Sequence, residues 1–178
     1  LPTYSILSCA EATACNANLT GVNFGNKVNG ETYEESVLKT RSEGSSKQIK
    51  YRFLYGNYSL QKANRPKYYD RAQKARHIIV KAFNELLAKY DAIILPAAPS
   101  HAPLVNKKAE TNSELENNYM AFANFGGFPS LTIPFALDKG LPLGLNITAK
   151  AFSDDVVLNL GYQIEQLTEL YNLHVGSR

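Results

Sequence analysis

The stretch that most constrains the fold is residues 121–134, AFANFGGFPSLTIP, in which a small-residue turn separates a helix-compatible segment from a short apolar strand. Gly126 and Gly127 permit positive φ and close backbone approach, and Pro129 fixes φ and removes a donor. The β-prone residues 130–133 are bounded by Pro134. The pattern predicts either the rim of a pocket, with backbone amides facing a ligand, or a tight turn between two core elements.

Length and composition predict one globular domain, residues 1–178. A chain of 178 residues with 44% hydrophobic residues buries roughly 70% of its extended surface on folding. It begins at Leu1 and its single methionine is Met120, so we expect a fragment of a larger subunit. No apolar run approaches the ~20 residues of a membrane span and no cleavable leader is present, so we expect a cytoplasmic protein that does not contact a membrane.

The order of elements predicts an α/β fold with a mixed β-sheet flanked by helices. Ser153 is an expected N-cap, followed by two aspartates that suit a helix N-terminus. Its helix is expected to bury Val156, Leu160, Ile164 and Leu167. Predicted strands are 1–7, 91–99, 131–135 and 143–148, predicted helices are 9–17, 33–41 and 66–90, and predicted loops are 23–30, 42–46 and 100–116. We expect the strand at 91–99 to be buried.

Basic residues concentrate in one part of the chain. The totals of 19 basic and 16 acidic residues are nearly balanced, yet residues 62–81 hold seven basic side chains against Asp70 alone. On the predicted helix, Lys67, Arg71, Lys74 and Lys81 share one side. An apolar stripe occupies another: Ala72, Ala75, Ile79, Phe83, Leu86 and Tyr90. The basic stripe is interpreted as a solvated face, with contact to RNA or an acidic partner as the alternative.

Candidate chemical groups are few. Cys9 and Cys15 have no histidine nearby, which is too little for a metal site, and reduced thiols are favoured over a disulfide. The three histidines share no ligand spacing, and His77 is expected to be a partly solvated helix residue. Phosphate-binding and nucleophile-elbow motifs are absent from the sequence. Arg52 lies in an apolar segment, where an arginine either binds a carboxylate bidentately or forms a structural ion pair.

Seven segments, in this order and approximate spacing, resemble a known family. They are residues 1–4, 10–12, 21–25, 68–79, 91–99, 124–134 and 141–145. They resemble the C-terminal part of the amidase signature family, and within it the A subunits of glutamyl-tRNA(Gln) amidotransferases. The resemblance covers nearly the whole chain and implies the C-terminal portion of the amidase signature fold.

The resemblance also implies an activity and partners. These subunits release ammonia from glutamine for the amidation of glutamate carried by tRNA(Gln), in a heterotrimer with subunits B and C. The family's catalytic Ser, Ser and Lys lie in an N-terminal half that this chain does not include, so it carries no catalytic residue and is expected to be inactive alone. The resemblance implies no cofactor here, and ATP and Mg²⁺ in a partner subunit.

Three positions are implied as substrate contacts. Tyr4 falls where the family lines the glutamine pocket with a tyrosine, and Arg52 where an arginine grips the substrate carboxylate. The family's acidic contact for the amino group falls at Asn117, so either Asn117 or the neighbouring Glu116 takes that role. Residues 18–20 also depart from the family pattern. These departures leave open a stand-alone amidase or, apart from the resemblance, a non-catalytic RNA- or protein-binding module.

Overall fold

The structure is a computed structural model, and it describes residues 2–98, 101–102, 104 and 120–170. Its contacts divide the chain into two compact units, residues 2–75 and the part from residue 76 onward, and each is described by itself. A single domain over 1–178 stays a prediction. In the described part of the chain, no helix combines the length and the apolar character needed to cross a membrane.

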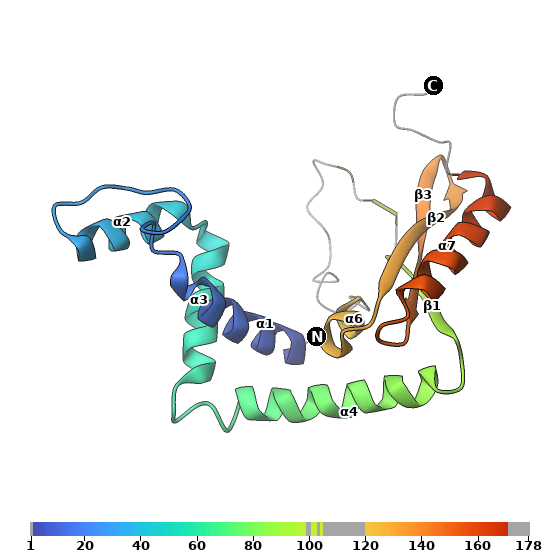
Figure 1. Cartoon of the computed structure of the whole chain (residues 1–178), viewed down its shortest axis with the longest axis horizontal. Coiled ribbons are helices and arrows are strands. Elements are labelled where there is room, and N and C mark those ends of the chain that lie inside the picture. The colour runs from blue at the N-terminus through green and yellow to red at the C-terminus, as the bar shows by residue number, and fades with distance from the viewer. Residues whose placement is uncertain (1, 99–100, 103, 105–119, 171–178) are drawn as a thin grey trace. The chain divides into compact units, whose positions relative to one another are not determined.

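The first unit is helical (Figure 1). It contains α1 (Pro2–Cys15), the short 3-10 helix η1 (Asn16–Asn18), α2 (Tyr33–Gly44), α3 (Lys47–Leu60) and the start of α4 (Tyr69–Leu87). The predicted strand at 1–7 was wrong, because residues 2–7 belong to α1. Leu7 and Ala10 are the buried residues of α1, and their spacing of three places them on one helical face. Packing of that face overrides the β-propensity of the segment.

Helices α1 and α3 approach closely at Gly56. A Cβ at this position would collide with the Cys9 carbonyl and the Thr13 hydroxyl of α1. The Thr13 hydroxyl donates to the Cys9 carbonyl at 2.8 Å and contacts the Phe53 carbonyl of α3 at 3.4 Å. Glycine is therefore required at 56 for the two backbones to meet.

The predicted helix at 33–41 is confirmed and extends to Gly44. The predicted turn at 42–46 was too long, because only Ser45 and Ser46 separate α2 from α3. Ser46 is the N-cap of α3, and its hydroxyl accepts from the Ile49 amide at 3.3 Å. Helix α2 continues to Gly44, which shortens the turn to the residues between the two helices.

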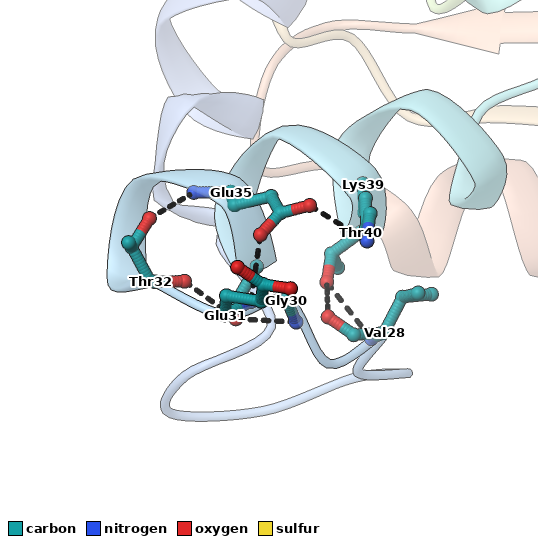
Figure 2. Close-up of polar contacts among 8 residues, drawn as sticks. Val28, Gly30, Glu31, Thr32, Glu35, Lys39 and Thr40 are labelled. Carbon is teal, nitrogen blue, oxygen red and sulfur yellow. Dashed lines mark hydrogen bonds and ion pairs between the residues drawn. The ribbon is translucent and has the colours of Figure 1, made fainter.

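The predicted loop at 23–30 is confirmed, and polar contacts anchor it to α2 (Figure 2). Thr32 is the N-cap, and its hydroxyl accepts from the Glu35 amide at 3.1 Å, while the Glu35 carboxylate accepts from the Glu31 amide at 2.7 Å. Further along, the Val28 amide donates to the Thr40 hydroxyl at 2.9 Å. The two bonds of Glu35 satisfy amides at the start of α2 in a variant of the capping box, in which the carboxylate accepts from the residue before the N-cap.

The second unit contains a three-stranded antiparallel sheet in the order β1-β3-β2. Its strands are β1 (Ala92–Pro96), β2 (Ser130–Asp138) and β3 (Leu141–Ala149). Lys139 and Gly140 join β2 to β3 with φ of 54° and 77°, as a type I′ hairpin turn requires. The α/β fold class and the strands expected at 131–135 and 143–148 are confirmed, and all pairs among the described strands are antiparallel, so the parallel pairing of a mixed sheet is not seen among them.

Two expectations about these strands were wrong. Strand β2 continues past Pro134, with a register shift between Pro134 and Ala136, because a bulge on a strand at the end of the described sheet tolerates a proline. The expected burial of the strand at 91–99 fails at Ile94, which is 50% exposed. A short apolar run in the sequence is compatible with a strand that is covered on both faces of the sheet and with a strand that is covered on one face, so the run alone does not predict the burial of Ile94.

The sequence predicted only in part which residues of α7 are buried and where α4 begins and ends. In α7 (Asp154–Thr168) the buried residues are Val157 and Gly161, whereas Leu167 is 84% exposed, contrary to expectation. Ser153 occupies the N-cap, but its side chain makes no capping bond. The helix at 66–90 is confirmed as α4, although it begins at Tyr69 and ends at Leu87.

The expected apolar stripe of α4 is confirmed from Ala72, which is buried, through the half-buried Ala75, Ile79 and Phe83, and it differs only at the C-terminal end of the helix. Leu87 is buried, packing with Ala123 and Phe128, and Phe83 joins this cluster. Leu86 and Tyr90 are exposed, so their predicted burial was wrong. Ala123 belongs to α6 (Ala121–Gly126), which confirms a helix before the glycine turn.

Candidate functional site

Tyr4 and Arg52, the implied substrate contacts, lie on the two neighbouring helices α1 and α3. Tyr4 is half-buried, and Arg52 is exposed. Contact between the helices is made by Thr13 and Phe53, and nine residues separate Tyr4 from Thr13, a helical rise of about 14 Å. The two side chains are therefore on contacting helices but at different levels. Asn117 and Glu116 lie outside the described residues, so all three roles stay predictions.

The surroundings of Arg52 distinguish between the two interpretations of an arginine here. Among the residues that the structure describes, no carboxylate lies within ion-pair distance of Arg52. The structural ion pair is therefore not seen in the described part of the chain. A guanidinium without an internal carboxylate partner retains its fork of donors for a ligand.

A cavity of about 800 Å³ lies in the first unit beside the α1 and α3 contact. All its lining residues are uncharged: Ser5, Ile6, Cys9, Leu54, Tyr55, Asn57, Tyr58, Ser59, Gln61 and Tyr68. The Tyr58 and Tyr68 rings are tilted, with centroids 5.6 Å apart. The hydrogen bond with the Tyr68 hydroxyl raises the pKa of Tyr58 above its ordinary value.

The sequence contains a signal for this cavity that sequence reasoning missed. Tyr51, Leu54, Tyr55 and Tyr58 recur at helical spacing of three and four. Without the α1 contact, however, nothing in the sequence indicates which face of α3 borders a hollow.

Arg41 has a structural role that sequence reasoning missed. Its guanidinium donates to the carbonyl oxygens of Asn16 at 2.9 Å and Ala17 at 3.3 Å, and it lies 5.9 Å from the ring centre of Phe53. A cation at the C-terminal end of η1 satisfies carbonyls that the helix leaves unpaired. Arg41 therefore ties α2 to the end of the preceding helices.

The glycine turn at 126–127 is a helix end. Gly127 adopts the left-handed conformation, with φ of 65°, and its amide donates to the Ala123 carbonyl. The Phe128 amide donates to the same oxygen at 3.1 Å. The Gly127 and Phe128 amides both donate within the turn, so they do not face a ligand and the pocket-rim interpretation was wrong for these two amides. The structure shows the alternative, a tight turn. Arg76 supports the turn by donating from Nε to the Phe125 carbonyl at 2.8 Å.

A polar cluster joins β2 to β3 on one face of the hairpin. Asn146, only 4% exposed, donates from Nδ2 to the Ser130 hydroxyl at 2.9 Å and the Thr132 hydroxyl at 3.0 Å. Its Oδ1 accepts from the Thr148 hydroxyl at 3.1 Å. Ser130 pairs with Thr148 and Thr132 with Asn146 across the strands, so the cluster stabilises this register. Polar residues alternating with apolar ones in both strands were the available signal.

The basic stripe is exposed at Lys67, Arg71, Lys74 and Lys81, as predicted, and His77 is exposed too. A neighbouring cation is used internally: Arg65 pairs with Asp70 at 3.3 Å. Both cysteines are free thiols, as expected. Over residues 2–98, 101–102, 104 and 120–170, no three acidic, histidine or cysteine side chains converge in a way that would hold a metal ion.

Comparison with known proteins relates this chain to amidases. The sequence model of the amidase family matches residues 1–158. The A subunit of the glutamyl-tRNA(Gln) amidotransferase of Clostridium botulinum (strain Eklund 17B) is 35% identical over 176 residues, covering 96% of this chain and 36% of the relative. Its counterpart in Pelagibacter ubique is 37% identical over 175 residues, covering 97% and 36%. The chain thus spans just over a third of the length of these curated relatives.

Solved structures show the same relationship. A crystal structure of an amidase matches with a TM-score of 0.67 and 25% identity, over 93% of this chain and 35% of that chain. The A subunit of the glutamyl-tRNA(Gln) amidotransferase of Thermotoga maritima matches with a TM-score of 0.53 and 20% identity, over 93% of this chain and 38% of that chain. The second match is a likeness of fold.

Proposed function

Because the chain belongs to the amidase signature family, we propose that it is part of the glutaminase subunit of a glutamyl-tRNA(Gln) amidotransferase. The observation that supports this most is the alignment of nearly the whole chain with A subunits of such enzymes at 35% and 37% identity. In this role the chain contributes walls of the glutamine pocket. The complete enzyme subunit releases ammonia from glutamine for the amidation of glutamate on tRNA(Gln).

Arg52 is proposed as the main contact for glutamine. A guanidinium makes two parallel charge-assisted hydrogen bonds to a carboxylate, and Arg52 has no ion-pair partner among the described residues. Tyr4 is proposed to line the pocket from α1, and Asn117 or Glu116 to bind the amino group. The chain supplies no catalytic residue in this proposal, because the Ser, Ser and Lys of the family are assigned to a part of the protein outside it.

The proposal names the partners that complete the reaction. Subunits B and C assemble with the glutaminase in the cytoplasm, and ATP and Mg²⁺ act in a partner subunit that amidates the tRNA-bound glutamate. The stripe of Lys67, Arg71, Lys74 and Lys81 is a solvated surface in this proposal.

A stand-alone amidase is the second candidate. It is favoured by one observation, the higher TM-score with an amidase structure (0.67) than with the structure of an amidotransferase glutaminase (0.53). Purification from the native source separates the two, because an amidotransferase glutaminase brings two further subunits with it and a stand-alone amidase does not.

The proposal is tested by replacing Arg52 in the assembled enzyme that contains this chain. Loss of one partner of a partly desolvated charge pair typically costs ~2–5 kcal/mol, so Arg52→Ala should raise the KM for glutamine roughly thirtyfold or more. Arg52→Lys keeps the charge without the fork and should raise it less. Use of free ammonia as nitrogen donor should be unchanged, because that reaction bypasses glutamine.

Lys50→Ala is the matched control, since Lys50 is an exposed cation on the same helix, and it should leave the KM unchanged. A wild-type KM in Arg52→Ala would refute the role of Arg52. Equal loss of glutamine- and ammonia-dependent activity would indicate a folding defect, which the control and a thermal unfolding curve would expose.

A further inference from the structure

Residues 44–69 combine positive charge with aromatic rings. The segment contains six basic and six aromatic residues and no aspartate or glutamate, although the whole chain has a net charge of only +3. It includes helix α3 and the connection to α4. A basic surface interleaved with aromatic rings is typical of proteins that bind single-stranded nucleic acids, because the cations pair with phosphates and the rings stack on bases.

Helix α3 presents this combination on one exposed face. Its members recur at spacings of three and four residues, which places them on the same side of the helix. All of them are exposed, and Tyr55 is 69% exposed. The buried residues Gly56 and Ser59 lie on another side. We call this surface the aromatic face of α3, and it consists of Lys47, Lys50, Tyr51, Leu54, Tyr55 and Tyr58.

The two lysines of the aromatic face are available to an anion. The Lys47 ammonium lies 5.9 Å from the centre of the Tyr51 ring, so a positive charge stands directly beside a ring. Among the residues that the structure describes, neither Lys47 nor Lys50 has a carboxylate within ion-pair distance. Arg65, by contrast, is paired with Asp70 at 3.3 Å.

The cavity beside α3 extends the aromatic face. Leu54, Tyr55 and Tyr58 line it together with Tyr68, whose ring centre is 5.6 Å from that of Tyr58. Its wall is almost wholly apolar, so a ligand gains contact there through the flat face of a ring and not through hydrogen bonds. A nucleobase suits such a wall, because every base has a π-face that stacks on an aromatic side chain.

Other ligands use only part of this surface. An acidic peptide pairs with the lysines but gains nothing from the tyrosines. A double helix offers its phosphates and keeps its bases stacked inside, so the rings do not reach the base faces. A neutral apolar molecule uses the cavity and leaves the lysines unpaired. Unpaired nucleotides use both the rings and the cations.

From these features we propose that the aromatic face of α3 binds unpaired nucleotides of an RNA. The bases stack on Tyr51, Tyr55 and Tyr58, and the phosphates pair with Lys47 and Lys50. The choice of RNA over DNA rests on the proposed function, in which the enzyme acts on glutamate carried by tRNA(Gln), whereas the stacking surface itself does not rest on it. The basic stripe of α4 is not part of this site.

Matched oligonucleotides test the proposal on the complete subunit that contains this chain. A fluorescein-labelled single-stranded RNA of about 12 nucleotides is titrated at physiological salt while fluorescence anisotropy is measured. An abasic strand with the same phosphates and a duplex of the same sequence are titrated beside it. The single strand should bind saturably with a Kd on the order of 1–100 μM. The abasic strand and the duplex should bind roughly tenfold or more weakly, because they offer no base faces for stacking.

Variants locate the site. Tyr55→Ala should weaken binding of the single strand roughly tenfold and leave the abasic strand unchanged, whereas Tyr55→Phe keeps the ring and should bind like the wild type. Lys47→Met should reduce the slope of log Kd against log salt by about 0.7, the value for one phosphate contact on a single strand. Tyr162→Ala is the matched control, because Tyr162 is a comparably exposed tyrosine on α7, a helix without lysine or arginine, and it should bind like the wild type.

Four results would overturn the proposal. The first is equal binding of the abasic strand and the normal single strand, which would leave charge alone, and the second is wild-type affinity in Tyr55→Ala. The third is tighter binding of polyglutamate than of RNA, which would assign the face to an acidic protein. The fourth is no saturable binding of the single strand by the complete subunit. None of these results bears on the KM for glutamine in Arg52→Ala, so the proposed function is tested separately.

Discussion

Replacing Gly56 by alanine tests the packing that forms the first unit. In an ordinary helix this change gains about 0.5–1 kcal/mol. Here the new Cβ would lie 2.8 Å from the Cys9 carbonyl carbon and still closer to the carbonyl oxygen and the Thr13 hydroxyl. The obstacle is largely backbone and cannot rotate away, so overpacking of about 1–3 kcal/mol outweighs the gain. We expect a net destabilisation of about 1–2 kcal/mol.

Amide hydrogen exchange measures this cost where it arises. Peptides from α1 and α3 should exchange roughly 5–30 times faster in Gly56→Ala. Gly44→Ala is the matched control, because a Cβ on this last residue of α2 meets nothing within 4 Å, and exchange there should stay the same or slow. Wild-type protection of α1 and α3 in Gly56→Ala would refute the close approach of the two helices.

Two further predictions concern polar contacts. Asn146→Ala should destabilise the second unit by about 1–3 kcal/mol, because the buried Thr148 hydroxyl loses its bond to Asn146 at 3.1 Å and keeps only the contact to Ser130 at 3.4 Å. Asn159→Ala, at an exposed residue bonded only to Gln163 among the described contacts, should change stability by no more than about 0.5 kcal/mol in urea unfolding; equal effects would contradict the role of the cluster. The hydrogen-bonded ion pair with Lys39 and, after it, the hydrogen bond from the Glu31 amide lower the pKa of Glu35 from 4.5. The stabilising contribution of Glu35 is therefore present above pH 4.5 and is lost as the pH falls through the lowered pKa. An NMR titration of Glu35 should show a midpoint below 4.5 that moves up in Lys39→Met and not in Lys47→Met, and an unshifted midpoint would contradict the pair.

Local pattern is enough to predict several elements. The strands at 91–99, 131–135 and 143–148 are apolar segments next to proline or glycine, which is the local signal that predicts them. The helix at 66–90 is long and strongly periodic. These features depend on residues close in the sequence, which is why the sequence alone predicts them.

The failures depend on distant contacts. Residues 2–7 form a helix because Leu7 and Ala10 bury one face, a constraint that is absent from the segment itself. In α4 the predicted apolar stripe fails only at its end, where Leu87 instead of Leu86 is buried, because Leu87 packs with Ala123 and Phe128 of distant segments. Arg41 and Asn146 take their roles from carbonyls and hydroxyls in other elements.

The family resemblance added candidate substrate contacts at Tyr4 and Asn117, and for Arg52 it favoured the carboxylate contact that the residues alone had left open beside a structural ion pair. The structure places Tyr4 and Arg52 on contacting helices and leaves their chemistry a proposal. It also brought out the uncharged cavity beside these helices, for which only the spacing of aromatic residues in α3 gave a sign.

The most direct test of the central claim is a crystal structure of the assembled enzyme that contains this chain, with glutamine bound. The account predicts that both outer nitrogens of Arg52, or one outer nitrogen and Nε, lie about 2.7–2.9 Å from the two oxygens of the α-carboxylate. A glutamine held elsewhere while the Arg52 guanidinium points into solvent, or a guanidinium paired with a protein carboxylate, would contradict it.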